Sequence, residues 1–133
     1  MFSSTQFKSI FAAGGAAISY LYGGWPALLQ VLLAFVVIDY LTGIISAALE
    51  GKLASAVGAR GIAKKVLIFV LVACAHLVDT ALGENHIIRD ATIFFYLGNE
   101  LLSIIENAGE IGLPIPPAIS NAVQVLREKS ELK

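Results

Sequence analysis

Long apolar runs, interrupted at helical spacing by a few polar residues, dominate the hydropathy pattern of this chain. The clearest run covers 28–49, LLQVLLAFVVIDYLTGIISAAL, in which Asp39 is the only charged residue. As an α-helix, these 22 residues rise about 33 Å, which is enough to cross a bilayer core of roughly 30 Å. The pattern therefore predicts a membrane-spanning helix that carries a carboxyl group near its middle.

Similar patterns predict further helices on either side of this central one. We expect helices at 6–22, 28–49, 62–82, 91–108 and 118–130. The GLPIPP segment separates the last two, because proline and glycine end helices. The fold class predicted is an all-α integral membrane protein with three to four transmembrane helices and a short C-terminal amphipathic helix. We expect a single membrane domain over 1–133.

The first helix, 6–22, allows two interpretations. Its small residues, such as Gly14 and Ala17, would let another backbone approach closely within a membrane. Its short length and moderate hydropathy also fit a helix that lies at the membrane surface. A cleaved signal peptide is disfavoured, because no clear cleavage site is followed by a soluble domain.

Composition supports the membrane assignment. Hydrophobic residues make up 57% of the chain and charged residues 14%, whereas a soluble domain carries about 25% charge. The mean hydropathy is +0.80. The single cysteine excludes an internal disulfide, and no basic face suited to nucleic acid is present.

Basic residues concentrate in one hydrophilic segment, 50–65, which is expected to be a loop. It contains Lys52, Arg60, Lys64 and Lys65, against Glu50 as the only acid. Short loops rich in lysine and arginine stay on the cytoplasmic side of a membrane. With four spans, this orientation places the C-terminus in the cytoplasm as well.

Polar residues at membrane depth are the candidate functional residues. They fall on helical stripes, and their side chains are expected to face other helices or an aqueous lumen. No lysine or arginine is expected at mid-membrane to pair with the acids, so these would share protons or form hydrogen bonds between helices. The candidates are Asp39, Thr42, Asp79, Asn99, Glu100, Ser103, Glu106 and Asn107.

Catalytic and cofactor motifs are not found in the sequence. It lacks GxxxxGK[ST], GxSxG, HExxH and CxxC, so we expect no enzyme activity and no cofactor. His76 and Asp79 lie one helical turn apart and are expected to form a hydrogen-bonded, proton-sensitive pair, or else a partly solvated helix end. Two such ligands are too few for a metal site, and none is expected.

Two blocks of the sequence, 39–79 and 95–119, resemble the toxin-secretion and phage-lysis holin family of Gram-positive phages and related secretion loci. The family pattern has an acid before a Thr-Gly pair, a basic loop with Gly-x-x-x-Lys and an acid that closes the third span. An Asn-Glu-x-x-Ser-x-x-Glu-Asn run and a Gly-x-Pro-x-Pro turn follow. The matching positions are Asp39, Thr42, Gly43, Gly61, Lys65, Asp79, Asn99, Glu100, Ser103, Glu106, Asn107, Gly112, Pro114 and Pro116.

This resemblance covers roughly two thirds of the chain, whereas the first 25 residues match only in character. It implies a multi-pass protein of the host cytoplasmic membrane that binds lipids, forms homo-oligomers and opens lesions at a set time. The lesions would release or activate an endolysin, without direct contact, or let a toxin out. Loss of membrane potential is the implied trigger.

Two other functions remain open at this point. An antiholin or regulatory membrane subunit would share the same sequence features. A small proton-coupled exporter built from two antiparallel copies would also be a bundle of short helices with a membrane acid. Such an exporter needs a weak charge bias so that both orientations insert, and the bias of the 50–65 segment is strong.

Overall fold

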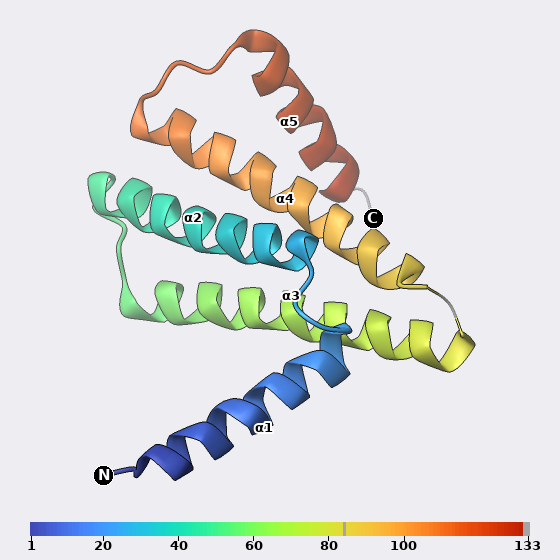
Figure 1. Ribbon diagram of the computed structural model, residues 1–133. Coiled ribbons are helices and arrows are strands. Elements are labelled where there is room, and N and C mark those ends of the chain that lie inside the picture. Colours follow the sequence, from blue (N-terminus) through green and yellow to red (C-terminus); the bar gives the residue numbers. More distant parts are fainter. Residues whose placement is uncertain (84, 132–133) are drawn as a thin grey trace.

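A computed structural model of the chain is all-helical, with no strand among the residues that it describes (Figure 1). It describes residues 1–83 and 85–131, with side chains at all of these except 56, 57, 123 and 126–131. The predicted all-α fold class is therefore confirmed. The helices are α1 (Ser4–Tyr22), α2 (Ala27–Leu49), α3 (Ser55–Leu82), α4 (Ile87–Ile111) and α5 (Pro117–Glu131).

Two helices extend well beyond their predicted ends. The third begins at Ser55 rather than at 62, and the fourth covers Ile87–Ile111 rather than 91–108. The added residues mix apolar and polar types, and the alanines and arginines among them favour a helix. The expected basic loop is consequently shorter than predicted, and Arg60, Lys64 and Lys65 all lie on α3.

By length and composition, α2 and the Gly58–Leu82 part of α3 are able to cross a membrane. Their apolar windows are 22% and 28% buried inside the molecule, whereas the core helix of a soluble protein is mostly buried. Most of their apolar surface therefore faces the surroundings, as it does in helices surrounded by lipid. Further spans at 6–22 and 91–108 remain predictions.

Helices α2, α3 and α4 pack side by side into a three-helix bundle (Figure 1). Helix α4 contacts α2 most extensively and α3 next. The apolar core occupies the half of the bundle in which α2 and α4 begin. It consists of Leu29, Leu32, Val36, Ile68, Val72 and Ile93.

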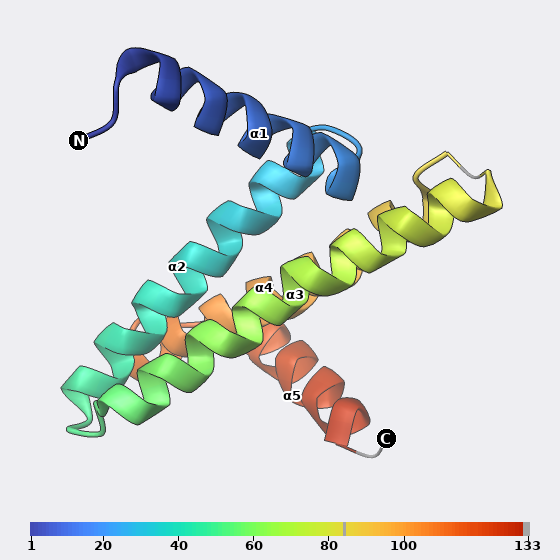
Figure 2. The same ribbon diagram turned by 90° about the horizontal axis from the view of Figure 1, so that it is seen from below.

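The remaining helices lie outside this bundle. In both views α1 leads away from the bundle instead of running along it, and none of its residues is buried over its described length (Figure 2). After α4 the backbone reverses at Gly112, whose φ of 111° favours glycine, and α5 folds back past α4. Contacts between α4 and α5 are sparse.

Candidate functional site

Asp39 lies on the face of α2 that packs against the other two helices of the bundle. Its side chain belongs to a stripe with Thr42 and Ser46, spaced three and four residues apart. Asp39 is buried on this face, while apolar residues on the opposite side of α2, such as Val37 and Leu41, are exposed. The structure thus places this carboxylate inside the bundle.

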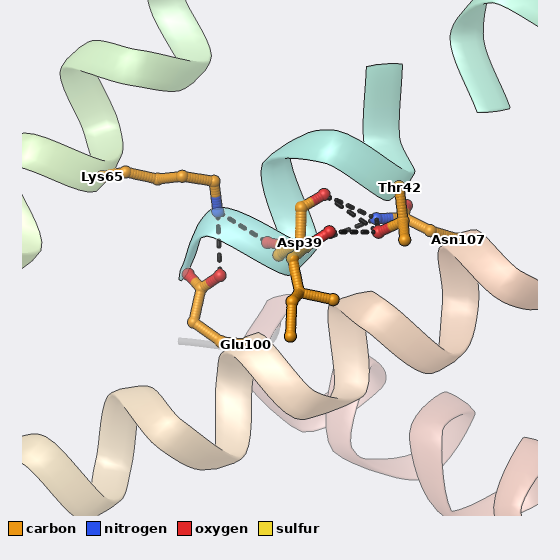
Figure 3. Close-up of polar contacts among 6 residues, drawn as sticks. Asp39, Thr42, Lys65, Glu100 and Asn107 are labelled. Atoms are coloured by element: carbon orange, nitrogen blue, oxygen red, sulfur yellow. Dashed lines mark hydrogen bonds and ion pairs between the residues drawn. The ribbon is translucent and has the colours of Figure 1, made fainter. Parts of the chain in front are cut away.

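The expectation that no basic residue reaches these acids is wrong. Lys65 on α3 extends its ammonium group inward, and its Nζ lies 2.6 Å from Asp39 Oδ2 and 2.8 Å from Glu100 Oε2 (Figure 3). The long aliphatic stem of a lysine allows this, because the charged group can sit far from the backbone. One ammonium therefore joins all three helices of the bundle.

Asn107 on α4 completes the hydrogen bonding of Asp39 (Figure 3). Its Nδ2 donates to Asp39 Oδ1 at 2.9 Å and to Thr42 Oγ1 at 2.9 Å. The same group lies 3.1 Å from the backbone oxygen of Asp39. We call Asp39, Thr42, Lys65, Glu100 and Asn107 the polar cluster.

The charges of the polar cluster do not balance when every group is ionised. Two carboxylates, those of Asp39 and Glu100, contact the same ammonium group and are therefore close to each other. All three side chains are largely shielded, at 9%, 7% and 18% exposure for Asp39, Glu100 and Lys65. A proton shared by the carboxyl pair would make the cluster neutral.

The other predicted residues of α4 divide between its two sides. Ser103 is half-buried and interacts with Asp39, so it lies beside the polar cluster. Glu106 is also half-buried, whereas Asn99 is exposed. The spacing of Glu100, Ser103 and Asn107 selects the side of α4 that faces α2 and α3.

Ser46 and Glu110 form a contact that the sequence did not single out as a site. Ser46 is buried, and its Oγ donates to Glu110 Oε2 at 2.8 Å. This bond joins the end of α2 to the end of α4. Helical spacing places each residue on a polar stripe of its own helix, but a stripe alone does not reveal its partner.

Asp79 lies near the opposite end of the bundle from Ser46 and has a structural role there. It is 1% exposed, and its two oxygens accept hydrogen bonds from the backbone N–H groups of Ile88, at 3.0 Å, and Arg89, at 2.8 Å. These N–H groups belong to the first turn of α4, where a helix has no internal acceptors and attracts negative charge. Asp79 therefore caps α4 from the preceding helix.

The hydrogen bond expected between His76 and Asp79 is not formed among the described residues. His76 instead stacks on His86, with ring centroids 5.5 Å apart, and the Nδ1 atoms of both are buried without a hydrogen-bond partner there. Beside them, the buried Arg89 donates from Nη1 to the backbone oxygen of Tyr22 at 2.7 Å. Arg89 lies between the helices predicted at 62–82 and 91–108, so the sequence did not indicate this contact.

The other three basic residues of the 50–65 segment differ from Lys65. Lys52 forms an exposed ion pair with Glu50 at 3.4 Å, which is worth little in water. Arg60 and Lys64 are exposed on the first turns of α3. Their predicted role in setting orientation is compatible with these positions and remains a prediction.

Comparisons with known proteins agree on one relationship. The model of a bacteriophage holin family matches residues 16–128. An uncharacterized protein of Halalkalibacterium halodurans is 50% identical over 117 residues, covering 84% of this chain and 87% of that protein. A protein of Bacillus phage phi105 named "probable holin" is 35% identical over 117 residues, covering 88% and 86% respectively. No solved structure matches.

Proposed function

The chain belongs to the bacteriophage holin family, and on this basis we propose that it assembles in the bacterial cytoplasmic membrane and opens lesions at a set time. The family indicates a non-enzymatic membrane protein that associates with other copies. The single observation that carries the proposal further is the polar cluster, because it is enclosed by helices with apolar outer faces.

Those outer faces support a location within lipid. The exposed apolar residues of α2 and α3 cover most of the helix surface that is turned away from the bundle. In water they would form a continuous apolar patch, which monomeric soluble proteins rarely expose. They include Val31, Leu33, Val37, Ile38, Leu41, Ile45, Val66, Leu67, Val70, Leu71 and Val78.

Within lipid, the polar cluster favours the closed three-helix bundle. Lys65, Asp39 and Glu100 lie on three different helices and satisfy one another. Separating these helices in hydrocarbon would expose uncompensated charges, at about 2.5–3.5 kcal/mol for each charged side chain even on the mildest insertion scale. The bundle is therefore suited to a dispersed, harmless form of the protein.

The lesion requires several copies, since one bundle is too thin to surround a channel that passes a folded hydrolase. We propose that α4 turns away from α2 and α3 when copies assemble. Glu100, Ser103 and Asn107 then line a shared aqueous opening, and water replaces the contacts of the polar cluster. The endolysin is released or activated through this opening without binding the holin.

The proposed orientation has α2, α3 and α4 crossing the membrane. The basic end of α3 and the short loop before it lie in the cytoplasm, and so does the C-terminus. The end of the bundle that carries Asp79, His86 and Arg89 then lies on the outer side of the membrane. Membrane lipids and further copies of the chain are the direct partners.

The experiment is induction of the gene alone in a bacterium that also produces a cytoplasmic wall hydrolase. The expected result is an abrupt loss of membrane potential followed by lysis, measured with a potential-sensitive dye and by turbidity. Glu100→Gln should shift the time of lysis, because it changes the charge of the polar cluster. Asn99→Ala, at the exposed neighbouring position, should leave that time unchanged.

Other results would contradict the proposal. A protein that delays lysis by a second holin, but has no effect alone, is an antiholin or a regulatory subunit. Resistance to a toxic cation without loss of potential indicates an exporter. If Glu100→Gln leaves lysis timing and lesion formation untouched, the polar cluster does not control opening.

A further inference from the structure

Helix α1 carries an apolar face that no described part of the chain covers. At about 100° per residue, Phe7, Ile10, Phe11 and Ile18 fall on one side of the helix. All four are exposed, and Phe11 is 77% exposed. Apart from Tyr20 near its C-terminal end, the other side carries small and polar residues and one cation, namely Thr5, Lys8, Ser9, Ala12, Ala16 and Ser19.

The direction of α1 keeps this apolar face away from the other helices. In both views α1 meets the bundle at its C-terminal end, beside the start of α2, and leads away from there at an angle to α2 and α3 (Figures 1 and 2). Its most extensive contacts with the bundle are to α3. Because α1 diverges from the two helices that are able to span a membrane, it does not run beside them as a further helix of the bundle.

The junction between α1 and the bundle fixes this direction. The Tyr22 hydroxyl donates to the backbone oxygen of Phe69 at 3.0 Å, and Arg89 Nη1 donates to the backbone oxygen of Tyr22 at 2.7 Å. Gly23 follows with a φ of 73°, and a Cβ atom there would lie 2.7 Å from His76 Cε1. Side chains from α1, α3 and the start of α4 thus hold the turn in one geometry.

We propose that α1 binds the lipid surface, lying in the headgroup region of the outer leaflet with its apolar face against the acyl chains. Amphipathic helices with this distribution of residues lie in the plane of the interface. Tyr20 and Trp25, both exposed beside the junction, have the amphipathic rings that are enriched at this depth. The outer leaflet follows from the orientation in the proposed function, on which this inference rests.

Lipid would cover the apolar face of α1 and also the exposed apolar residues of α2 beside it. The exposed apolar residues of α2 begin at Val31, shortly after the turn that ends α1. A bilayer boundary at this level covers the apolar sides of α1 and α2 together and leaves Lys8 and Ser9 in water. A second copy packed on α1 would cover the apolar side of α1 but would leave the apolar side of α2 exposed.

Site-directed spin labelling of the full chain tests this placement. In a Cys74→Ser background, single cysteines replace Phe11 or Ile18 on the apolar side and Ser9 or Ala16 on the polar side. Leu33→Cys, at an exposed position of α2, gives the hydrocarbon reference. The protein is studied in vesicles of phosphatidylcholine and phosphatidylglycerol, with oxygen and a water-soluble nickel complex as collision partners.

Labels at positions 11 and 18 should share one shallow depth and collide mainly with oxygen, while labels at positions 9 and 16 should collide mainly with the nickel complex. If the labels closer to Gly14 lie deeper in the bilayer than those further from it, on both sides of the helix, α1 spans the membrane and the proposal is overturned. Spin–spin broadening, together with protection of the labels from both oxygen and the nickel complex, would show that a second copy covers α1 and would also overturn the proposal. A label at position 33 outside hydrocarbon would instead refute the spans of the proposed function.

Discussion

At the scale of single residues, Lys64 and Lys65 show how position decides the role of a side chain. They are adjacent on α3 and carry the same charge, but Lys64 is exposed whereas Lys65 reaches two carboxylates inside the bundle. Residues next to each other on a helix point about 100° apart. This difference places the Lys65 ammonium between α2 and α4 and leaves the Lys64 ammonium outside.

Replacing Lys65 by methionine should destabilise the bundle much more than the same change at Lys64. Lys65→Met leaves Asp39 and Glu100 buried without a cation, and breaking a buried pair in this way costs about 3–5 kcal/mol. Lys64→Met should change the free energy of unfolding by less than about 0.5 kcal/mol. Thermal unfolding in detergent micelles, followed by circular dichroism, measures both.

The two variants lower the charge of α3 equally, so an effect on membrane orientation would appear in both. Adding Glu100→Gln to Lys65→Met removes one of the stranded carboxylates and should recover part of the lost stability. Equal unfolding temperatures for the two single variants would show that the contacts of Lys65 do not stabilise the bundle.

At the scale of elements, the end of α1 and the start of α4 depend on residues from other helices. Asp79 of α3 caps α4, and Arg89 of α4 holds the last carbonyl of α1. The residue before α4, His86, has a φ of 62° and makes no side-chain capping bond of its own. The helix ends are thus tied together at one end of the bundle, next to Gly23.

Gly23→Ala should loosen this junction. The left-handed backbone costs a residue with a side chain about 1–2 kcal/mol, and the new methyl group would also meet His76 and Arg89. Gly24→Ala carries a similar backbone strain, at a φ of 110°, but has open space around it. The unfolding temperature should therefore fall further for Gly23→Ala.

Gly14→Ala serves as the control within α1, because it lies in a regular helix with open space around it. It should stabilise the helix by about 0.5–1 kcal/mol, since alanine loses less backbone entropy than glycine. If Gly23→Ala were as harmless as Gly14→Ala, the junction would not fix the direction of α1.

At the scale of the whole molecule, the bundle is polar at its two ends and within the polar cluster, while its sides are apolar. One end carries the short α2–α3 loop with the basic start of α3, and the other carries the α3–α4 turn. The charge difference between these ends should set the orientation of the chain in the membrane.

Cysteine labelling measures that orientation. In a Cys74→Ser background, Asn85→Cys in the α3–α4 turn should react with a membrane-impermeant maleimide in intact protoplasts. Leu53→Cys, exposed in the α2–α3 loop, should react only after permeabilisation. The opposite pattern would reverse the proposed topology, and reaction at both sites before permeabilisation would indicate mixed orientations.

Local sequence pattern accounts for the helical fold class and for the stripe of α2 that holds Asp39. It also determined which residues of α4 could share a face. Helix periodicity is local, so the spacing of Asp39, Thr42 and Ser46, or of Glu100, Ser103 and Asn107, fixes their common direction. The long apolar runs likewise required helices, because a backbone in lipid must satisfy its own hydrogen bonds.

Which groups meet is settled by the packing of the helices against one another. Lys65 belonged by sequence to a basic loop, and its pairing with Asp39 and Glu100 depends on how three helices pack and on a long flexible stem. The cap that Asp79 gives to α4 and the direction of α1 at Gly23 are also decided there. Each arises from contacts between separate helices, which the periodicity of any one helix does not encode.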